Sequence, residues 1–222
     1  MGYKAVIFDF DGVLNDTEGI KFNAWHKIAS QFGEKISKKF FIKNCCGRSS
    51  EAISKILIKK YGIRLNPKEF AERVYTISVS LLKKEIKPIK NNIELLKKSY
   101  KMLNGMVGVA SSQKRGILLF SLKKMKIKKY FKEIVAGDEI KRMKPAPDVY
   151  LRICKKLKAK PEQCIVIEDS QAGVEAACNA GIGKVIAIPR EYTKYQDFLK
   201  ADIVIKKQKS LERLTPYLAS NQ

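Results

Sequence analysis

Short apolar runs recur along the chain, and segments long enough for helices lie between them. The first run covers residues 3–8 and leads directly into Asp9. Similar runs follow at residues 106–110, 134–136, 164–167, 185–188 and 203–205, with helix-length segments at 116–126, 147–157 and 171–180. Apolar runs without polar alternation are typical of strands buried on both faces of a parallel sheet. Their alternation with helices predicts an α/β fold with a Rossmann-like core, in which helices cover both faces of a parallel sheet to give three layers.

Residues 18–85 interrupt this alternation. Apolar side chains recur there at helical spacing, and glycines divide the stretch. The apolar positions are Phe22, Trp25, Ile28, Ala29, Phe32, Ile53, Ile56, Leu57 and Tyr61, and the glycines are Gly33, Gly47 and Gly62. A helical block of this length after the first strand predicts an inserted α-helical cap domain, residues 17–86. Residues 1–16 and 87–222 would then form the Rossmann-like core domain.

The composition is that of a globular protein, since 45% of the 222 residues are hydrophobic and 30% are charged. No stretch approaches the roughly 20 apolar residues that a membrane span needs. The first apolar run meets Asp9 almost at once, which is unlike a signal peptide. We therefore expect a cytoplasmic protein without a membrane partner.

The cysteine pattern favours the same compartment. The five cysteines are Cys45, Cys46, Cys154, Cys164 and Cys178, an odd number without C-x-x-C spacing. This pattern favours neither a zinc site nor a disulfide framework. The adjacent pair Cys45 and Cys46 could be redox-active, but we interpret it as two small hydrophobic side chains in a helix or at its end.

The formal net charge of +23 raises the question of nucleic-acid binding. Lysine supplies 37 of the 45 basic residues and arginine only 8. Base recognition favours the planar guanidinium of arginine, so this balance argues against a specific nucleic-acid partner. The lysines are also spread between apolar residues at helical spacing, which is typical of solvated helix faces. We expect no more than loose attraction to polyanions at low salt.

Two pairs of acidic residues directly follow apolar runs. Asp9 and Asp11 leave the first run, and Glu168 and Asp169 leave the fourth. Ligands of parallel sheets bind outside the carboxyl ends of the strands, so we expect both pairs at one edge of the sheet. Carboxylates this close repel each other and normally need a cation beside them. Oxygen ligands without histidine or cysteine suit Mg²⁺ rather than zinc.

Two further polar segments fit the same edge. Ser111 and Ser112 follow the run at 106–110, where hydroxyl and free backbone N–H groups can hold a phosphate. Lys144 lies in the sequence M-K-P-A-P-D just before a predicted helix, and the prolines fix its position. We interpret the single histidine, His26, as a residue of a helix face rather than as a ligand.

These four segments occur in the order of the four motifs of the haloacid dehalogenase-like (HAD) superfamily, which the chain resembles over nearly its whole length. The sequences are D-F-D-G-V-L-N-D-T from Asp9, S-S from Ser111, K-P-A-P-D from Lys144 and E-D-S-Q-A-G-V-E-A-A from Glu168. They are similar to the branch that contains β-phosphoglucomutase and phosphoglycolate phosphatase. In that branch a helical cap follows the first strand, as predicted here.

The resemblance implies catalytic roles for four residues. Asp9 would be the nucleophile that forms an aspartyl-phosphate, and Asp11 the general acid and then the general base. Ser111 and Lys144 would hold the phosphoryl oxygens, with Ser112 beside them in substrate binding. Lys144 would also steady Asp9, which agrees with the need of a carboxylate nucleophile for a nearby cation.

The resemblance also implies a Mg²⁺ site. Asp9, Asp169 and the backbone carbonyl of Asp11 would bind the ion, with Glu168 either as a further ligand or as a neighbour that supports the ligands. The cofactor predicted from both the residues and the resemblance is therefore Mg²⁺.

The cap departs from the β-phosphoglucomutase pattern at two positions. Lys21 stands where that family has a histidine, and Ser50 stands where it has an arginine, although Arg48 lies two residues earlier. These changes favour a Mg²⁺-dependent phosphatase that hydrolyses a small phosphomonoester, such as a sugar phosphate or phosphoglycolate. Lys21 and Arg48 are then candidate anion-binding groups on the cap, the alternative being plain surface charge.

Other functions stay open at this point. The nearest alternative is a β-phosphoglucomutase-like phosphohexomutase, and a more distant one is a phosphonate hydrolase that uses a cap lysine as a Schiff base. An alternative of another class is a non-catalytic polyanion-binding protein on the same scaffold. We expect the partner to be a small phosphorylated metabolite and the protein to be a monomer or weak dimer.

Overall fold

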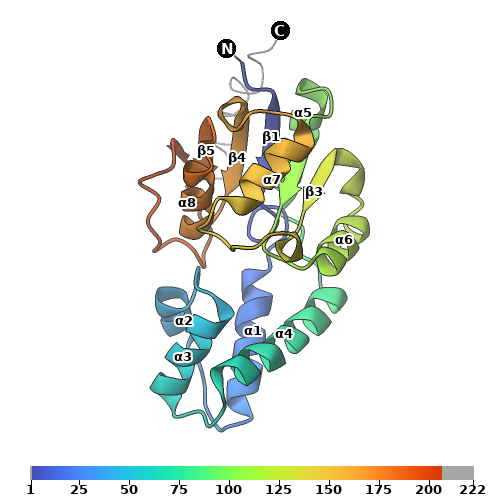
Figure 1. Ribbon diagram of the computed structural model, residues 1–222. Helices are drawn as coiled ribbons and strands as arrows, with labels where there is room; N and C mark the ends of the chain where they lie inside the picture. Colours follow the sequence, from blue (N-terminus) through green and yellow to red (C-terminus); the bar gives the residue numbers. More distant parts are fainter. Residues whose placement is uncertain (1, 207–222) are drawn as a thin grey trace.

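The computed structural model describes residues 2–206, and its centre is a six-stranded sheet (Figure 1). All neighbouring strands are parallel, in the order β3-β2-β1-β4-β5-β6. The strands are β1 Ala5–Phe8, β2 Val107–Ala110, β3 Glu133–Val135, β4 Cys164–Glu168, β5 Lys184–Ala187 and β6 Ile203–Val204. The six predicted strands are confirmed, with small shifts at their ends.

Helices cover both faces of this sheet. On one face lie α5 (Lys90–Met102) and α6 (Arg115–Lys124), and on the other α7 (Asp148–Leu157) and α8 (Gln171–Asn179). Successive side chains of a strand point to opposite faces, so β1 serves two hydrophobic clusters. Val6 and Phe8 pack in the cluster with α5 and α6, whereas Ala5 and Ile7 pack in the cluster with α7 and α8. The predicted three-layer α/β core is confirmed.

Short 3-10 helices connect several of these elements. They are η1 Lys128–Tyr130, η2 Gly137–Glu139 and η3 Pro161–Gln163. The helix predicted at 147–157 begins at Asp148, and Pro147 stands at the N-cap, where its carbonyl accepts from the N–H of Leu151. The segment between η2 and α7 carries Lys144 to the carboxyl end of the sheet.

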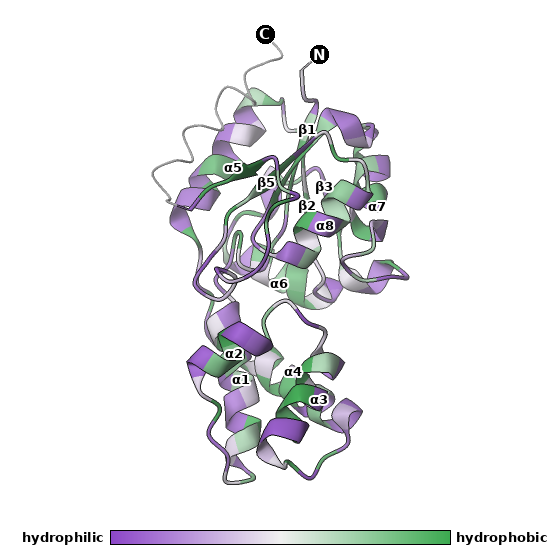
Figure 2. Ribbon diagram, turned by 90° about the vertical axis from the view of Figure 1, so that its left-hand side faces the viewer, coloured by the Kyte–Doolittle hydropathy of each residue, from purple (hydrophilic) through white to green (hydrophobic). Residues whose placement is uncertain are grey.

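Four helices below the sheet in Figure 1 form a separate unit, which we call the cap helices. They are α1 Glu18–Ser30, α2 Lys38–Asn44, α3 Ser50–Tyr61 and α4 Pro67–Lys84. Side chains of Ser37, Ser49 and Asn66 accept backbone hydrogen bonds at the starts of α2, α3 and α4, which explains where these helices begin. Each cap helix carries both hydrophilic and hydrophobic residues (Figure 2).

The cap helices have their own hydrophobic cluster, distinct from the two that flank the sheet. Trp25 of α1 and Phe70 of α4 meet edge to face there, with ring centroids 5.0 Å apart. Cys45 is buried in the same cluster, directly after α2, as expected of a small hydrophobic side chain. A hydrophobic cluster of its own supports our proposal that residues 17–86 form a domain.

The two chain segments that join the cap helices to the core run side by side. The backbone N–H of Asp16 donates to the carbonyl of Lys87, at 2.8 Å, and the N–H of Lys87 donates to the side chain of Asn15, at 2.9 Å. Asn15 is fully buried. These bonds fix where the first cap helix leaves the carboxyl end of β1.

A loop of the core after β5 provides a third contact with the cap helices. Arg190 pairs with Asp16 at 3.4 Å, and Glu191 pairs with Lys38 of α2 at 2.9 Å. The next residue, Tyr192, is 8% exposed and packs in the hydrophobic cluster of the cap helices. The core therefore contacts the cap helices through Tyr192 and the Glu191–Lys38 ion pair, while Arg190 pairs with the segment that leads into α1.

Replacement of Tyr192 by alanine is expected to lower the free energy of unfolding by about 3 kcal/mol, because a large buried side chain leaves a cavity. The matched control is Tyr195→Ala in the same loop, since Tyr195 is 66% exposed. We expect that control to change the free energy of unfolding by less than about 0.5 kcal/mol. Urea unfolding of both variants tests this, and equal effects would show that Tyr192 is not an anchor.

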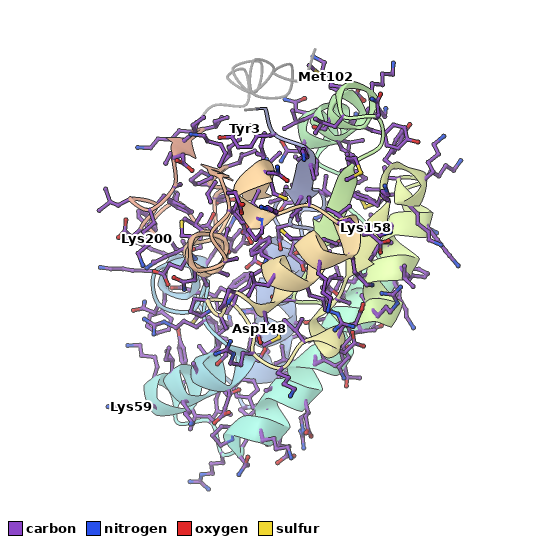
Figure 3. The ribbon with its side chains drawn as sticks, turned by 45° about the horizontal axis from the view of Figure 1, so that its top comes forward. Tyr3, Lys59, Met102, Asp148, Lys158 and Lys200 are labelled. Carbon is purple, nitrogen blue, oxygen red and sulfur yellow. The ribbon has the colours of Figure 1, made fainter. Side chains whose placement is uncertain are left out.

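Lysine side chains project from many elements of the outer surface (Figure 3). Lys59 of α3, Lys158 after α7 and Lys200 before β6 are all exposed. This distribution agrees with the interpretation of the positive charge as solvated surface. None of the helices in residues 2–206 combines the length and the apolar character needed to traverse a bilayer.

Candidate active site

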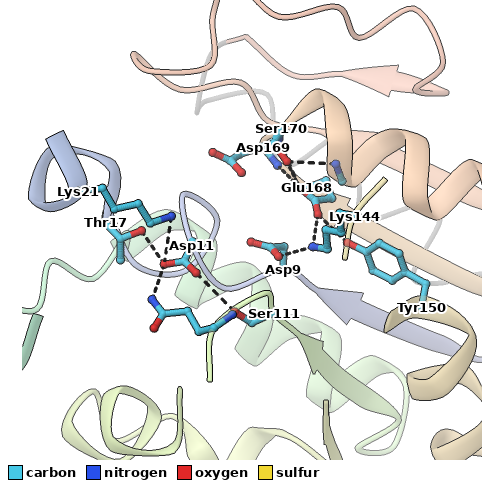
Figure 4. A network of polar contacts seen from close by, with 12 residues as sticks. Asp9, Asp11, Thr17, Lys21, Ser111, Lys144, Tyr150, Glu168, Asp169 and Ser170 are labelled. Atoms are coloured by element: carbon cyan, nitrogen blue, oxygen red, sulfur yellow. Dashed lines mark hydrogen bonds and ion pairs between the residues drawn. The ribbon is translucent and has the colours of Figure 1, made fainter. Parts of the chain in front are cut away.

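The polar residues predicted to share one sheet edge do meet there (Figure 4). Strand β1 lies between β2 and β4, so its last residue, Phe8, is level with Val109 and Ile167. Asp9 therefore emerges beside Ser111 on one side and beside Glu168 and Asp169 on the other. The meeting point follows from strand order and register alone.

Three carboxylates form the centre of the site. Asp9, Glu168 and Asp169 each offer an oxygen atom, and these atoms all lie within 4.8 Å of one another. Their residues are 6%, 0% and 4% exposed. Burial raises the pKa of Asp9 to about 8, against the effect of a neighbouring ammonium group, and burial next to Glu168 and Asp9 raises the pKa of Asp169 well above its usual range.

The acidic cluster is suited to a hard divalent cation. Its donor atoms are all oxygens, and a divalent cation would favour the charged forms of the Asp9 and Asp169 carboxyls, which burial opposes. Gly12 adopts φ +75°, and a Cβ atom there would lie 1.9 Å from Oδ2 of Asp169. Glycine at this position therefore leaves the space that the Asp169 carboxylate occupies.

Lys144 is the cation in contact with this cluster. Its Nζ lies 2.5 Å from Oδ1 of Asp9 and 2.5 Å from Oε1 of Glu168, and its side chain is only 8% exposed. Burial alone would lower the pKa of Lys144, but the two carboxylates raise it well above its usual range. Burial likewise opposes the charge of Glu168, yet Lys144 lowers the pKa of that carboxyl. Lys144 and Glu168 therefore form a charged pair.

Asp11 is held by a different set of groups, all of them donors. Its Oδ1 accepts hydrogen bonds from Oγ1 of Thr17 at 2.6 Å and from Nε2 of Gln113 at 2.8 Å. Its Oδ2 accepts a longer one, 3.4 Å, from Oγ of Ser111, which is itself fully buried. These donors fix the carboxyl of Asp11 beside the carboxylate cluster rather than within it.

Lys21 approaches the site from the cap helices. Nζ of Lys21, from α1, lies 2.6 Å from Oε1 of Glu18 and 3.9 Å from Oδ1 of Asp11. Although burial opposes the effect, Asp11 and Glu18 raise the pKa of Lys21, so its ammonium stays charged. Lys21, one of the two cap residues predicted to bind an anion, thus lies beside the Asp11 carboxylate.

The structure places Arg48 and Ser112 at exposed positions. Arg48 directly precedes Ser49, which is the N-cap residue of helix α3. Ser112 is exposed next to the buried Ser111. Both side chains stay candidates for binding a substrate between cap and core.

Sequence reasoning missed three residues that the site uses: Thr17, Gln113 and Tyr150. Thr17 ends the acidic motif that begins at Asp9, so its spacing could have suggested a partner for Asp11. Gln113 lies two residues after Ser111 and had no signal of its own. Tyr150 was hidden in the apolar face of α7, yet its hydroxyl donates to Glu168.

A cavity lies beside the site rather than in it. Its volume is about 890 Å³, and the segment from Ile188 to Lys206 supplies most of its lining. Gly12, Asp16 and Glu18 line it as well, but Asp9, Lys144 and Asp169 do not. We therefore do not assign this cavity to the reacting group.

The fold and site together define a class of protein, an α/β protein whose buried carboxylates and lysine meet at the carboxyl ends of its central strands. The family model of the haloacid dehalogenase-like hydrolases matches residues 6–188. A phosphorylated carbohydrates phosphatase of Thermotoga maritima is 31% identical, over 90% of this chain and 92% of that protein. The chain therefore belongs to the haloacid dehalogenase-like hydrolases.

Two further relatives come from the mutase side of the family. A beta-phosphoglucomutase of Bacillus subtilis is 30% identical, over 94% of this chain and 91% of that protein. The crystal structure of a beta-phosphoglucomutase from Clostridium difficile is 29% identical, covers 98% of each chain and has a TM-score of 0.75. The comparisons thus establish the family, and the relatives in it are named both as phosphatases and as mutases.

Proposed function

We propose that this protein is a Mg²⁺-dependent phosphatase that hydrolyses a small phosphomonoester of the sugar phosphate or phosphoglycolate type. The observation that carries the proposal is the buried carboxylate of Asp9, which contacts Lys144 on one side and lies beside Asp169 on the other. The name of the Thermotoga maritima relative supports the substrate class.

Asp9 acts as the nucleophile and takes the phosphoryl group as an aspartyl-phosphate. A carboxylate and a phosphate dianion repel each other, so the reaction needs positive charge at the point of attack. Lys144 provides part of that charge through its Nζ, 2.5 Å from Asp9. The hydroxyl of Ser111 lies on the opposite side of Asp9, where it can hold a phosphoryl oxygen, whereas the N–H of Ser111 donates to the carbonyl of Val135.

Asp11 acts as the general acid that protonates the leaving oxygen and then as the base that takes a proton from water. The donors Thr17 and Gln113 hold its carboxyl in place. Lys21 brings a cap ammonium to the same carboxyl. Transfer of the proton therefore takes place where the cap meets the core.

Asp9, Asp169 and the backbone carbonyl of Asp11 would hold Mg²⁺, with Glu168 next to them. When bound there, the ion offsets the repulsion between carboxylate and phosphate and stabilises charge on the phosphoryl oxygens. The oxygen-only donor set fits this ion.

The cap helices would cover the substrate and exclude bulk water. Lys21 would then bind the substrate from the cap, with Arg48 and Ser112 as further candidates between cap and core. We extend the proposal to a cytoplasmic monomer or weak dimer that acts on a small phosphorylated metabolite, in line with the cysteine pattern of the sequence.

A phosphohexomutase is the second candidate function. The 30% identity to the beta-phosphoglucomutase of Bacillus subtilis along nearly the whole chain favours it. Lys21 and Ser50 at the two cap positions that differ from that pattern favour the phosphatase instead. The two functions differ only in the acceptor of the phosphoryl group, which is water or a sugar.

The test is phosphate release from a panel of small phosphomonoesters, with Mg²⁺ and with chelator. The panel includes β-glucose 1-phosphate, with formation of glucose 6-phosphate followed in parallel. Metal-dependent release of phosphate is the expected result, whereas isomerisation without release would establish the mutase. Absence of both reactions, together with retention on heparin, would favour a non-catalytic polyanion-binding protein.

A further inference from the structure

Tyr150 is the largest fully buried side chain of the described residues, and its polar end faces the site rather than the hydrophobic cluster around it. Its hydroxyl donates a hydrogen bond of 2.7 Å to Oε1 of Glu168 (Figure 4). Burial, together with the charge of Glu168, raises the pKa of Tyr150 well above its usual range, so the hydroxyl keeps its proton. Tyr150 is therefore a permanent donor to Glu168.

Both oxygens of Glu168 are occupied by groups of the protein. Oε1 accepts from Tyr150 and from Lys144, and Oε2 accepts from the N–H of Asp169 at 3.0 Å and from the N–H and hydroxyl of Ser170 at 3.3 and 3.1 Å. A Cβ atom at Gly173 would lie 1.9 Å from Oε1, so α8 closes directly over the carboxylate. Glu168 consequently has little freedom to turn toward an ion.

Through the bonds to Oε2, Glu168 fixes the backbone at Asp169 and Ser170 and so orients Asp169. The same carboxylate holds Lys144, which it shares with Asp9 at equal distances of 2.5 Å. Tyr150 contacts this lysine as well, because Nζ lies 4.9 Å from the centre of the tyrosine ring. One side chain of α7 thus touches both partners of the buried ion pair that borders Asp9 and Asp169.

We propose that Tyr150 is a positioning residue that locks Glu168 and Lys144, so that Asp9 and Asp169 are held ready for the divalent ion. In this arrangement Glu168 supports the ligands through hydrogen bonds and does not bind the ion itself. The inference rests on the proposed Mg²⁺-dependent function, and it assigns a role to a helix residue outside the four sequence motifs.

The test is Tyr150→Phe, which removes only the hydroxyl and keeps the ring next to Lys144. Glu168 then loses one donor, and the Asp9 and Asp169 carboxylates lose part of their orientation. Groups that orient metal ligands typically change metal affinity by about 10- to 100-fold, so we expect Mg²⁺ to bind at least about 10-fold more weakly by calorimetric titration. For phosphate release we expect kcat to fall while KM, set by contacts with the cap, changes little.

The matched control is Tyr3→Phe. The hydroxyl of Tyr3 donates a hydrogen bond of 3.2 Å to the carbonyl of Gly183, outside the carboxylate cluster. We expect this variant to bind Mg²⁺ like the wild type.

The outcomes separate this inference from the function on which it rests. Wild-type affinity for Mg²⁺ and wild-type kcat in Tyr150→Phe, with or without a lower melting temperature, would overturn the positioning role and leave the phosphatase standing. Absence of Mg²⁺ binding by the wild-type protein would overturn both.

Discussion

Replacement of Asp9 by asparagine is expected to reduce phosphate release at least about 1,000-fold, because an amide cannot replace the carboxylate as nucleophile. Loss of the nucleophile acts on kcat, whereas contacts of the substrate with Lys21 and the rest of the cap are unchanged. The measurement is the steady-state rate with Mg²⁺ on the best substrate of the panel. A variant that keeps more than a tenth of the wild-type rate would exclude Asp9 as the nucleophile.

The same variant should remain folded, which makes the loss of activity interpretable. The asparagine side chain would keep an oxygen that can accept from Lys144, and the substitution would remove one of the three buried acidic groups of the cluster. In the presence of chelator we therefore expect the melting temperature of Asp9→Asn to be at least that of the wild type. Asp197→Asn, at an exposed position of the loop after β5, is the control and should keep full activity.

Much of this site follows from the sequence because parallel strands end together. Once the apolar runs before Asp9, Ser111 and Glu168 are interpreted as neighbouring strands, their first polar residues must meet at one edge. Lys144 could also be predicted, since the prolines after it define the approach to α7. Local sequence and the rules of sheet topology therefore suffice for the centre of the site.

Other parts of the site depend on packing that the sequence pattern does not contain. Tyr150 occupies an apolar position of α7, and only the depth of burial beside Glu168 gives its hydroxyl a role. Gln113 reaches Asp11 because the loop after β2 turns back toward β1, a direction that residue type does not specify. Arg48 is exposed just before α3, and its role in binding an anion stays a prediction.

The sequence pattern did not predict the contact between core and cap either. Tyr192 lies in a loop of the core, yet it packs with residues of α1 and α2 that precede it by more than a hundred positions. Such long-range burial depends on how two folded units meet and leaves no periodic signal. We propose that contacts between cap and core also select the substrate.

Replacement of Lys144 by methionine is expected to have the largest effect on stability. Methionine fills a similar volume but leaves the buried carboxylates of Asp9 and Glu168 without their shared cation. Removing one partner of a buried ion pair typically costs about 3–5 kcal/mol, and we expect the free energy of unfolding at neutral pH to fall by about that amount. Phosphate release should fall by about 100- to 1,000-fold, since the phosphoryl oxygens lose a positive neighbour. Lys124→Met, at an exposed position of α6, is the control and should change neither quantity.

The pH dependence of this loss distinguishes electrostatics from packing. Lys144 lowers the pKa of Glu168 below its ordinary value of 4.5, so their pairing contributes stability above that value and loses it as pH falls through the lowered pKa. In Lys144→Met the burial of Glu168 remains and favours the protonated carboxyl. Lowering the pH therefore reduces the destabilisation of the variant. The difference in unfolding free energy between variant and wild type should therefore shrink as pH is lowered from about 7.5 to about 5. A difference that stays constant over this range in urea unfolding would mean that Lys144 stabilises the protein by packing and not by its charge.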